Sequence, residues 1–196
     1  KYILHFNPDA MINDSVIENL YNNVEKTDFG IISVKQSNDQ TKILNNTCNL
    51  IEVDNVKGFV MLIKNSVIKE VNYFDENFFL YLEEIDLCKR LKLSNKKICL
   101  APNIYVKHFA GKSHDPNFSD KMEIQRNWHY MWSLFYFNKK YKGFLYAFKI
   151  TIGKFISAFF KLIIFFIINK KKHQIYKHRF LGLLNSYLNK KSKFRS

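Results

Sequence analysis

Residues 74–90, FDENFFLYLEEIDLCKR, contain the pattern that decides the fold and the chemistry expected of this chain. An aromatic run ends at three carboxylates, Glu83, Glu84 and Asp86, where a helix over residues 82–93 is predicted to begin. A carboxylate in the first turn of a rigid helix can act as a general base. Acidic residues there also stabilise the helix dipole, and Asp86 with Arg90 forms an ordinary pair four residues apart. The cluster alone leaves a catalytic and a structural interpretation open.

Two shorter motifs lie on either side of this cluster. NPDA at 7–10 follows a predicted strand, KYILHF, and HFAGKS at 108–113 follows another. Taken alone, Asn-Pro-Asp is a common turn, and a single His is more often a hydrogen-bonded surface residue than a ligand. Their order and spacing relative to the acidic cluster give them weight.

Together, these motifs resemble the second half of a family 2 glycosyltransferase with the GT-A fold, in particular bacterial rhamnosyltransferases and similar surface-polysaccharide enzymes. The resemblance covers residues 1 to about 145. It implies an α/β fold, namely a partial GT-A domain that lacks its first strands. It also implies an inverting transfer of a sugar from a nucleotide-sugar donor.

The family motif is an acidic pair, one residue, then Asp-Leu, with Arg four positions after that Asp. This chain has Glu83-Glu84-Ile85-Asp86-Leu87 and Arg90. The resemblance therefore implies that Glu84 is the catalytic base, with Glu where the family usually has Asp. Glu83 and Asp86 are the alternative catalytic residues, and Asp86 fits better as a residue that orders the site through Arg90.

The resemblance also implies a divalent cation, Mg²⁺ or Mn²⁺, at the donor diphosphate. Asp9 matches the family's Asp after the strand leading into that site, and His108 matches a His that completes the coordination or contacts the diphosphate. A cation there would neutralise charge on the leaving group, and hard oxygen ligands suit both metals. Gly58, Gly111 and Ser113 match further binding positions, and a glycine lets backbone approach phosphate closely.

The implied partners are a nucleotide-sugar donor such as dTDP-rhamnose and a lipid-linked or polysaccharide acceptor. The implied location is the cytoplasmic face of the bacterial inner membrane. The family's first half carries most of the nucleotide contacts. Because the chain opens inside a strand-like segment without an initiator Met, we expect a piece of a longer enzyme that is inactive alone.

Alternating apolar strands and helices indicate an α/β layer fold over residues 1–116. Strands are predicted at 1–6, 28–35, 56–63 and 97–109, the last broken at Pro102; helices are predicted at 16–24, 65–71 and 82–93. Residues 117–142 form an aromatic helical extension, and residues 143–196 form basic, apolar helices that associate with membranes. The three cysteines lack a CxxC spacing and indicate buried or incidental thiols.

The charge is segregated along the chain. Residues 124–196 contain 13 Lys, 3 Arg and no acid, a net charge of +16, whereas residues 1–123 contain 15 basic and 17 acidic residues, a net charge of −2. Such a block usually faces anionic lipid or nucleic acid. Here the lysines interrupt an apolar stretch at 143–168, which favours a membrane surface over nucleic acid. Lys149, Lys154 and Lys161 oppose spanning, so a peripheral, interfacial helix is predicted.

Other functions remain open on the sequence alone. The main alternative is a non-catalytic, membrane-associated protein that acts through its basic helices. A glycosidase also uses two carboxylates, but that chemistry does not explain Asp9, His108 or the basic C-terminal third.

Overall fold

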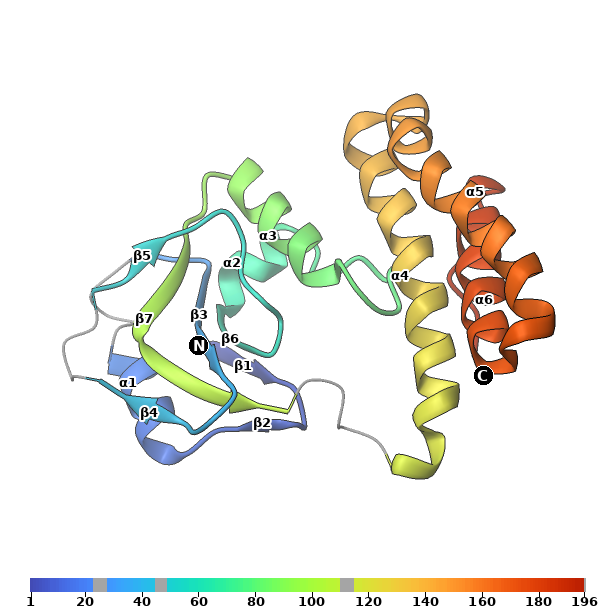
Figure 1. Cartoon of the computed structure of the whole chain (residues 1–196). Coiled ribbons are helices and arrows are strands. Elements are labelled where there is room, and N and C mark those ends of the chain that lie inside the picture. Colours follow the sequence, from blue (N-terminus) through green and yellow to red (C-terminus); the bar gives the residue numbers. More distant parts are fainter. Residues whose placement is uncertain (23–27, 45–48, 110–114, 196) are drawn as a thin grey trace. The chain divides into compact units, whose positions relative to one another are not determined.

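The computed structural model describes residues 1–22, 28–44, 49–109 and 115–195, and the chain falls into two compact units (Figure 1). The first unit comprises Lys1–Asp75 and Glu84–His114; the second comprises Glu76–Glu83 and Asp115–Ser196. Strands and helices combine in the first unit, and helices dominate the second. The mixed α/β class predicted from the sequence is confirmed.

The first unit is built on a sheet of seven strands in the order β1-β6-β3-β7-β2, with β4 and β5 also pairing with β7. Strands β1 and β3 both run antiparallel to β6, β3 is parallel to β7, and the remaining three short strands are antiparallel to β7. The strands are β1 (Tyr2–Phe6), β2 (Ala10–Met11), β3 (Ile31–Ser37), β4 (Lys42–Ile43), β5 (Ile51–Glu52), β6 (Val60–Lys64) and β7 (Ile98–His108). The helices that accompany them are α1 (Asp14–Asn22), α2 (Asn65–Glu70) and α3 (Glu83–Leu93).

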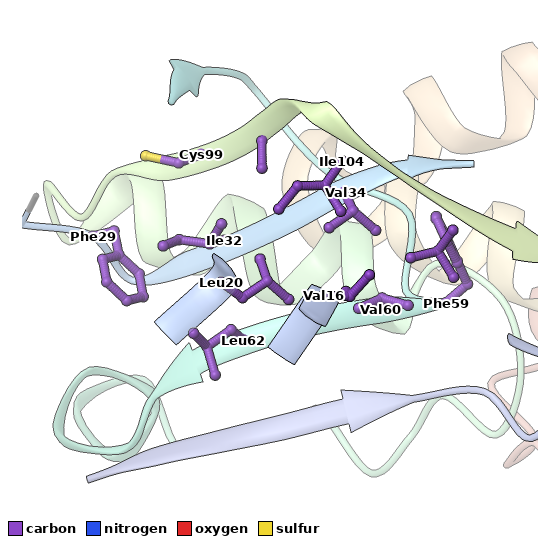
Figure 2. Packing of buried hydrophobic residues seen from close by; sticks show 12 residues of the cluster. Val16, Leu20, Phe29, Ile32, Val34, Phe59, Val60, Leu62, Cys99 and Ile104 are labelled. Atoms are coloured by element: carbon purple, nitrogen blue, oxygen red, sulfur yellow. The ribbon is translucent and has the colours of Figure 1, made fainter. Parts of the chain in front are cut away.

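Side chains of the central strands point alternately to the two faces of the sheet and form a separate hydrophobic core on each face. Ile32 of β3 faces Val16 and Leu20 of α1, as Figure 2 shows. The preceding residue, Ile31, packs on the opposite face with residues of α2 and α3, including Leu87. Because successive strand residues point to opposite faces, a run of apolar residues can serve both layers. The first unit is therefore a sheet covered by α1 on one face and by α2 and α3 on the other.

The long strand β7 is continuous, although a break was predicted at Pro102. The interruption appears in the pairing: Val34 of β3 pairs with Ala101, and Lys35 pairs with Tyr105. Proline has no backbone N–H to donate to a ladder, so the strand bulges there instead of ending. The carbonyl of Asn103, inside the bulge, accepts a hydrogen bond from the backbone N–H of Leu44 (3.0 Å), next to β4.

Helix α1 begins slightly earlier than predicted. The side chain of Asn13 accepts a hydrogen bond from the backbone N–H of Val16 (3.1 Å), and the Ser15 hydroxyl donates to the same oxygen (2.8 Å). Asn13 is therefore the residue that caps this helix. The predicted end of the helix, beyond residue 22, lies outside the described residues.

The second unit contains three long helices that pack against one another: α4 (Ser119–Lys142), α5 (Phe144–Ile168) and α6 (Lys170–Tyr187), preceded by the short helix η1 (Pro116–Phe118) (Figure 1). Its core is formed by Met131 and Phe135 of α4, Ala147 of α5 and Leu183 of α6. These helices account for the three helical segments predicted after residue 117.

Close approach of α4 and α6 depends on a glycine. A Cβ at Gly182 would lie 2.4 Å from the carbonyl oxygen of Trp128, a separation that real Cβ atoms do not show. The Ser186 hydroxyl, one turn further along α6, donates to the carbonyl of Trp132 (3.0 Å). The two helices therefore pack backbone against backbone at this point.

Candidate active site

Asp9 and His108 are brought together by a two-residue strand. In β2, Ala10 pairs with His108 at the end of β7, and the backbone N–H of Phe109 donates to the Asp9 carbonyl (3.1 Å). As a result, His108 Nε2 lies 3.1 Å from Asp9 Oδ1. The exposed fractions of these side chains are only 11% and 6%, respectively. Two residues that the sequence analysis assigned to one site are therefore direct neighbours.

The imidazole of His108 is held on several sides. The Phe59 ring stacks on it, with centroids 5.0 Å apart and planes 14° from parallel. Asn7 Nδ2 lies 3.5 Å from His108 Nε2, the atom that also faces Asp9. The other ring nitrogen, Nδ1, is buried and has no hydrogen-bond partner among the described residues. The orientation of the His108 ring is therefore set by its stacking on Phe59 and by its contact with Asp9.

The Asp9–His108 pair fits the donor set of a divalent cation. Mg²⁺ and similar cations bind oxygen ligands at about 2.1 Å, so adjacent ligands of an octahedral ion lie about 3 Å apart. The carboxylate oxygen and the imidazole nitrogen, 3.1 Å apart, form a direct hydrogen bond in this structure, and the same separation is compatible with two ligands of one ion. No group of three or more His, Cys, Asp or Glu side chains suited to a metal occurs in the described part of the chain. Two protein ligands are consistent with an ion that is otherwise held by a diphosphate and water.

Glu84 lies in the first turn of α3, against the backbone at Gly58. A Cβ at Gly58 would come within 3.3 Å of the Glu84 Cβ and 3.4 Å of its Cγ. Among the described residues, the buried Oε2 of Glu84 has no hydrogen-bond partner. Burial raises the pKa of Glu84, and backbone groups of Glu84 and Ile85 offset this in part. A carboxylate with a raised pKa and an oxygen that lacks a hydrogen-bond partner among the described residues is a stronger base than an exposed carboxylate, as proton transfer requires.

Asp86 occupies a different environment from Glu84. It is fully buried, and Arg90 Nε donates to its Oδ2 at 2.8 Å. The guanidinium of Arg90 also donates to the carbonyl of Val71, the residue that caps the end of α2. Asp86 therefore fixes α3 against α2 through Arg90. This environment supports an ordering role better than direct proton transfer.

Glu83 is the first residue of α3 and belongs to the second unit. Two residues with positive φ, Tyr81 and Leu82 (both 69°), immediately precede it. Side chains larger than glycine rarely adopt this conformation, so the entry to α3 is strained. Within the same unit, burial raises the pKa of Tyr81, Arg126 lowers it and Glu83 raises it.

The other predicted positions divide into two groups. Gly58 contacts the Glu84 side chain, as described above. Gly111 and Ser113 lie outside the described residues. The roles assigned to all of these residues remain predictions.

Sequence reasoning missed two residues that support the site. Phe59 was interpreted only as part of an apolar strand, yet its ring stacks on His108. Thr41 donates a hydrogen bond to the Met11 carbonyl (2.6 Å) and accepts one from the Lys107 backbone N–H (3.0 Å), so it fastens β2 to β7. No local signal marks Thr41, which occurs in a polar, Asn-rich stretch. The position of Phe59 was a possible signal, because it directly follows Gly58, a predicted site residue.

Comparison with known proteins places the similarity among glycosyltransferases. One relative is the low-salt glycan biosynthesis hexosyltransferase Agl10 of Haloferax volcanii, 31% identical over 117 residues, which cover 49% of this chain and 38% of that protein. Another is the rhamnosyltransferase WbbL of Escherichia coli K12, 40% identical over 58 residues, which cover 30% of this chain and 22% of that protein. The chain thus spans well under half the length of either relative. No family model matches it.

Proposed function

We propose that this chain carries the catalytic and acceptor side of an inverting GT-A glycosyltransferase of family 2. In this proposal Glu84 is the general base, and Asp9 with His108 would hold Mg²⁺ or Mn²⁺ at the donor diphosphate. The observation that carries the proposal is the Glu84 carboxylate, which has a raised pKa and a buried oxygen with no hydrogen-bond partner among the described residues. The partial similarity to two glycosyltransferases supports the same reaction class.

The reaction requires two tasks that these residues can perform. The acceptor hydroxyl must lose a proton as its oxygen forms the new glycosidic bond, and Glu84 accepts that proton. Meanwhile the bond between the sugar and the diphosphate breaks, and a bound cation would supply positive charge at the diphosphate leaving group. Asp9 and His108 would hold that cation.

The proposed donor is a nucleotide sugar such as dTDP-rhamnose, and the proposed acceptor is a lipid-linked or polysaccharide glycan of the cell envelope. The printed name of one relative describes a rhamnosyltransferase, and that of the other describes a hexosyltransferase of glycan biosynthesis. These names support a sugar donor of the hexose class. Rhamnose is the more specific proposal, and it rests on the rhamnosyltransferase alone, whose match covers fewer residues than the match to the hexosyltransferase.

We place the protein at the cytoplasmic face of a bacterial inner membrane, held peripherally. Among the described residues, one helix, α5, is long and apolar enough to cross a membrane by length and composition. Its most apolar window has a mean hydropathy of 2.0, and only 11% of that window is buried among the described residues, which supports contact with a membrane. Lys149, Lys154 and Lys161 are all exposed on it. Each central Lys costs about 2.5–3.5 kcal/mol on insertion, which favours an interfacial position.

The test is Glu84→Gln in the full-length protein, assayed with a nucleotide-sugar donor and a lipid-linked acceptor. Removal of a general base should lower turnover by about 10²- to 10⁴-fold while donor binding changes little. Glu18→Gln, which changes an exposed carboxylate of α1, is the matched control and should retain activity. Turnover of Glu84→Gln within a few-fold of wild type would remove Glu84 from the role. Absence of any turnover by the wild type would favour the non-catalytic alternative.

A further inference from the structure

A hollow of about 330 Å³ lies between α5 and α6, far along the chain from the candidate active site. Its α5 side is lined by Gly153, Lys154, Ser157, Ala158 and Lys161, and its α6 side by Tyr176 and Arg179. All seven residues belong to the second unit. The small side chains on α5 leave the space, and the three long cationic side chains surround it.

Two of the three cations, Lys161 and Arg179, lie near one aromatic ring, that of Tyr176. Lys161 Nζ lies 5.1 Å from the centroid of the Tyr176 ring, and the Arg179 guanidinium lies 5.8 Å from the same centroid. Lys154 and Lys161 are seven residues apart, so they project from almost the same side of α5. The face of the Tyr176 ring attracts both positive groups.

No acidic side chain balances these charges. Residues 124–196 contain no Asp or Glu, and among the described residues Lys154, Lys161 and Arg179 form no ion pair. Elsewhere in the unit the situation differs, because Lys171 contacts Asp120 (2.8 Å) and Glu123 (3.2 Å). Three cations without an ion-pair partner among the described residues therefore line one hollow, and they can bind an anion from outside the chain.

The chemistry of the lining fits a phosphate group. Arg179 offers a planar fork of N–H donors, and the two lysines add point charges. Ser157 also lines the hollow and adds a neutral hydroxyl donor. The same helix also exposes Phe160, Ile163 and Ile164, among other large apolar side chains. A polynucleotide would leave those side chains in water, whereas a lipid would cover them with its acyl chains.

We infer that the hollow between α5 and α6 binds the phosphate headgroup of an anionic membrane lipid, with the apolar side of α5 against the acyl chains. This site differs from a diffuse attraction of the basic segment to a charged surface, because it depends on particular residues. It is independent of the proposed glycosyl transfer, and either one can fail without the other.

The experiment measures binding of the 196-residue chain to phosphatidylcholine vesicles that contain phosphatidic acid. The test variant is Lys154→Ala/Lys161→Ala/Arg179→Ala. The control, Lys149→Ala/Lys170→Ala/Lys177→Ala, removes three exposed charges from the same two helices outside the hollow. Because diffuse attraction falls equally in both variants, their difference isolates the site. Loss of charge-assisted bonds should make the test variant bind at least about tenfold more weakly than the control.

A second variant keeps the charge and fills the hollow. Ser157→Leu should also bind phosphatidic acid vesicles about tenfold more weakly than wild type, since the lost site is worth at least one charge-assisted bond. Circular dichroism of each variant checks that the helices are retained.

Four outcomes would overturn the inference. Equal losses in the two triple variants would show diffuse charge only, and wild-type binding by Ser157→Leu would exclude the hollow. Glycerol 3-phosphate binding as tightly as the vesicles would make the occupant a soluble phosphate ester. Single-stranded DNA bound with the same dependence on Lys154, Lys161 and Arg179 would make it a nucleic acid.

Discussion

Replacing Glu84 with Met should stabilise the first unit at neutral pH while removing the proposed base. Met keeps the Cβ and Cγ atoms that lie against Gly58 and replaces the carboxylate, whose buried Oε2 has no hydrogen-bond partner among the described residues. An unsatisfied buried polar group costs about 1–3 kcal/mol, and the backbone groups of Glu84 and Ile85 that stabilise the carboxylate offset part of this cost. The free energy of unfolding should therefore rise by up to about that amount. Gain of stability with loss of activity is typical of residues kept for function.

The assay needs a probe in the first unit. Both tryptophans, Trp128 and Trp132, lie in α4 of the second unit, so fluorescence would miss this change. Cys88 is suitable because it is fully buried one turn after Glu84 on α3. Labelling of its thiol in urea, followed by mass spectrometry, reports opening of this unit. A gain of about 1–3 kcal/mol should slow labelling by roughly 5- to 150-fold.

The direction of the Glu84 pKa shift predicts how stability depends on pH. Burial raises the pKa of Glu84 above its ordinary value of 4.5, so the folded state binds this proton more tightly than the unfolded state. Wild-type stability should therefore fall as the pH rises from 4.5 through the folded pKa, and the Met variant should lack that fall. The advantage of the variant should disappear near pH 4. Glu18→Met, at an exposed position on α1, should change stability by less than about 0.5 kcal/mol. Faster labelling of Cys88 in Glu84→Met would refute the argument, since the lost backbone hydrogen bonds of Glu84 and Ile85 would then outweigh the cost of the unsatisfied oxygen.

Three further predictions follow from other contacts. In the full-length enzyme, Asp9→Ala should raise the Mn²⁺ concentration needed for half-maximal activity at least about tenfold, and full activity in excess chelator would reassign Asp9. Gly182→Ala should destabilise the second unit by about 1–3 kcal/mol, because the new Cβ would meet the Trp128 carbonyl at 2.4 Å. Urea unfolding followed by tryptophan fluorescence measures this change. The control Gly153→Ala, where the space is open, should stabilise the unit by about 0.5–1 kcal/mol. Burial lowers the pKa of His129 to about 4, so the unfolded state binds this proton more readily than the folded state. The free energy of unfolding of the second unit should therefore fall by up to about 3 kcal/mol as the pH falls from 6.5 to 4, and a stability that does not change with pH would contradict this.

Much of the fold could be predicted because its elements have strong local signals. The helix α3 was expected at 82–93 and extends over Glu83–Leu93, since acids precede a helical apolar pattern. The long apolar helix α5 was expected at 143–168 and extends over Phe144–Ile168. In both cases the periodicity itself carries the information. The sequence pattern could not show that β7 continues through Pro102, because proline can interrupt either a strand or only its pairing.

The contact between Asp9 and His108 could not be derived from periodicity. It depends on β2, a strand of two residues that is too short to show alternation, and it joins positions 99 residues apart. The family resemblance placed both residues in one site without explaining how they meet. The structure supplies the physical reason: β2 pairs with the end of β7, and Thr41 fastens the two strands.

The dipeptide Gly58-Phe59 links the two parts of the candidate site. Gly58 allows the chain to lie against the Glu84 side chain, and Phe59 stacks on the His108 ring. Both residues directly precede β6, which pairs on both sides with neighbouring strands, so their backbone starts from a rigid element. In the proposed function, Glu84 and the Asp9–His108 pair act in one reaction and must keep a fixed separation, because small displacements lower the rate steeply. Gly58 thus permits close packing beside Glu84, and Phe59 orients the His108 ring. Under the proposed function, a larger residue at position 58 would disturb the proposed base, Glu84, first.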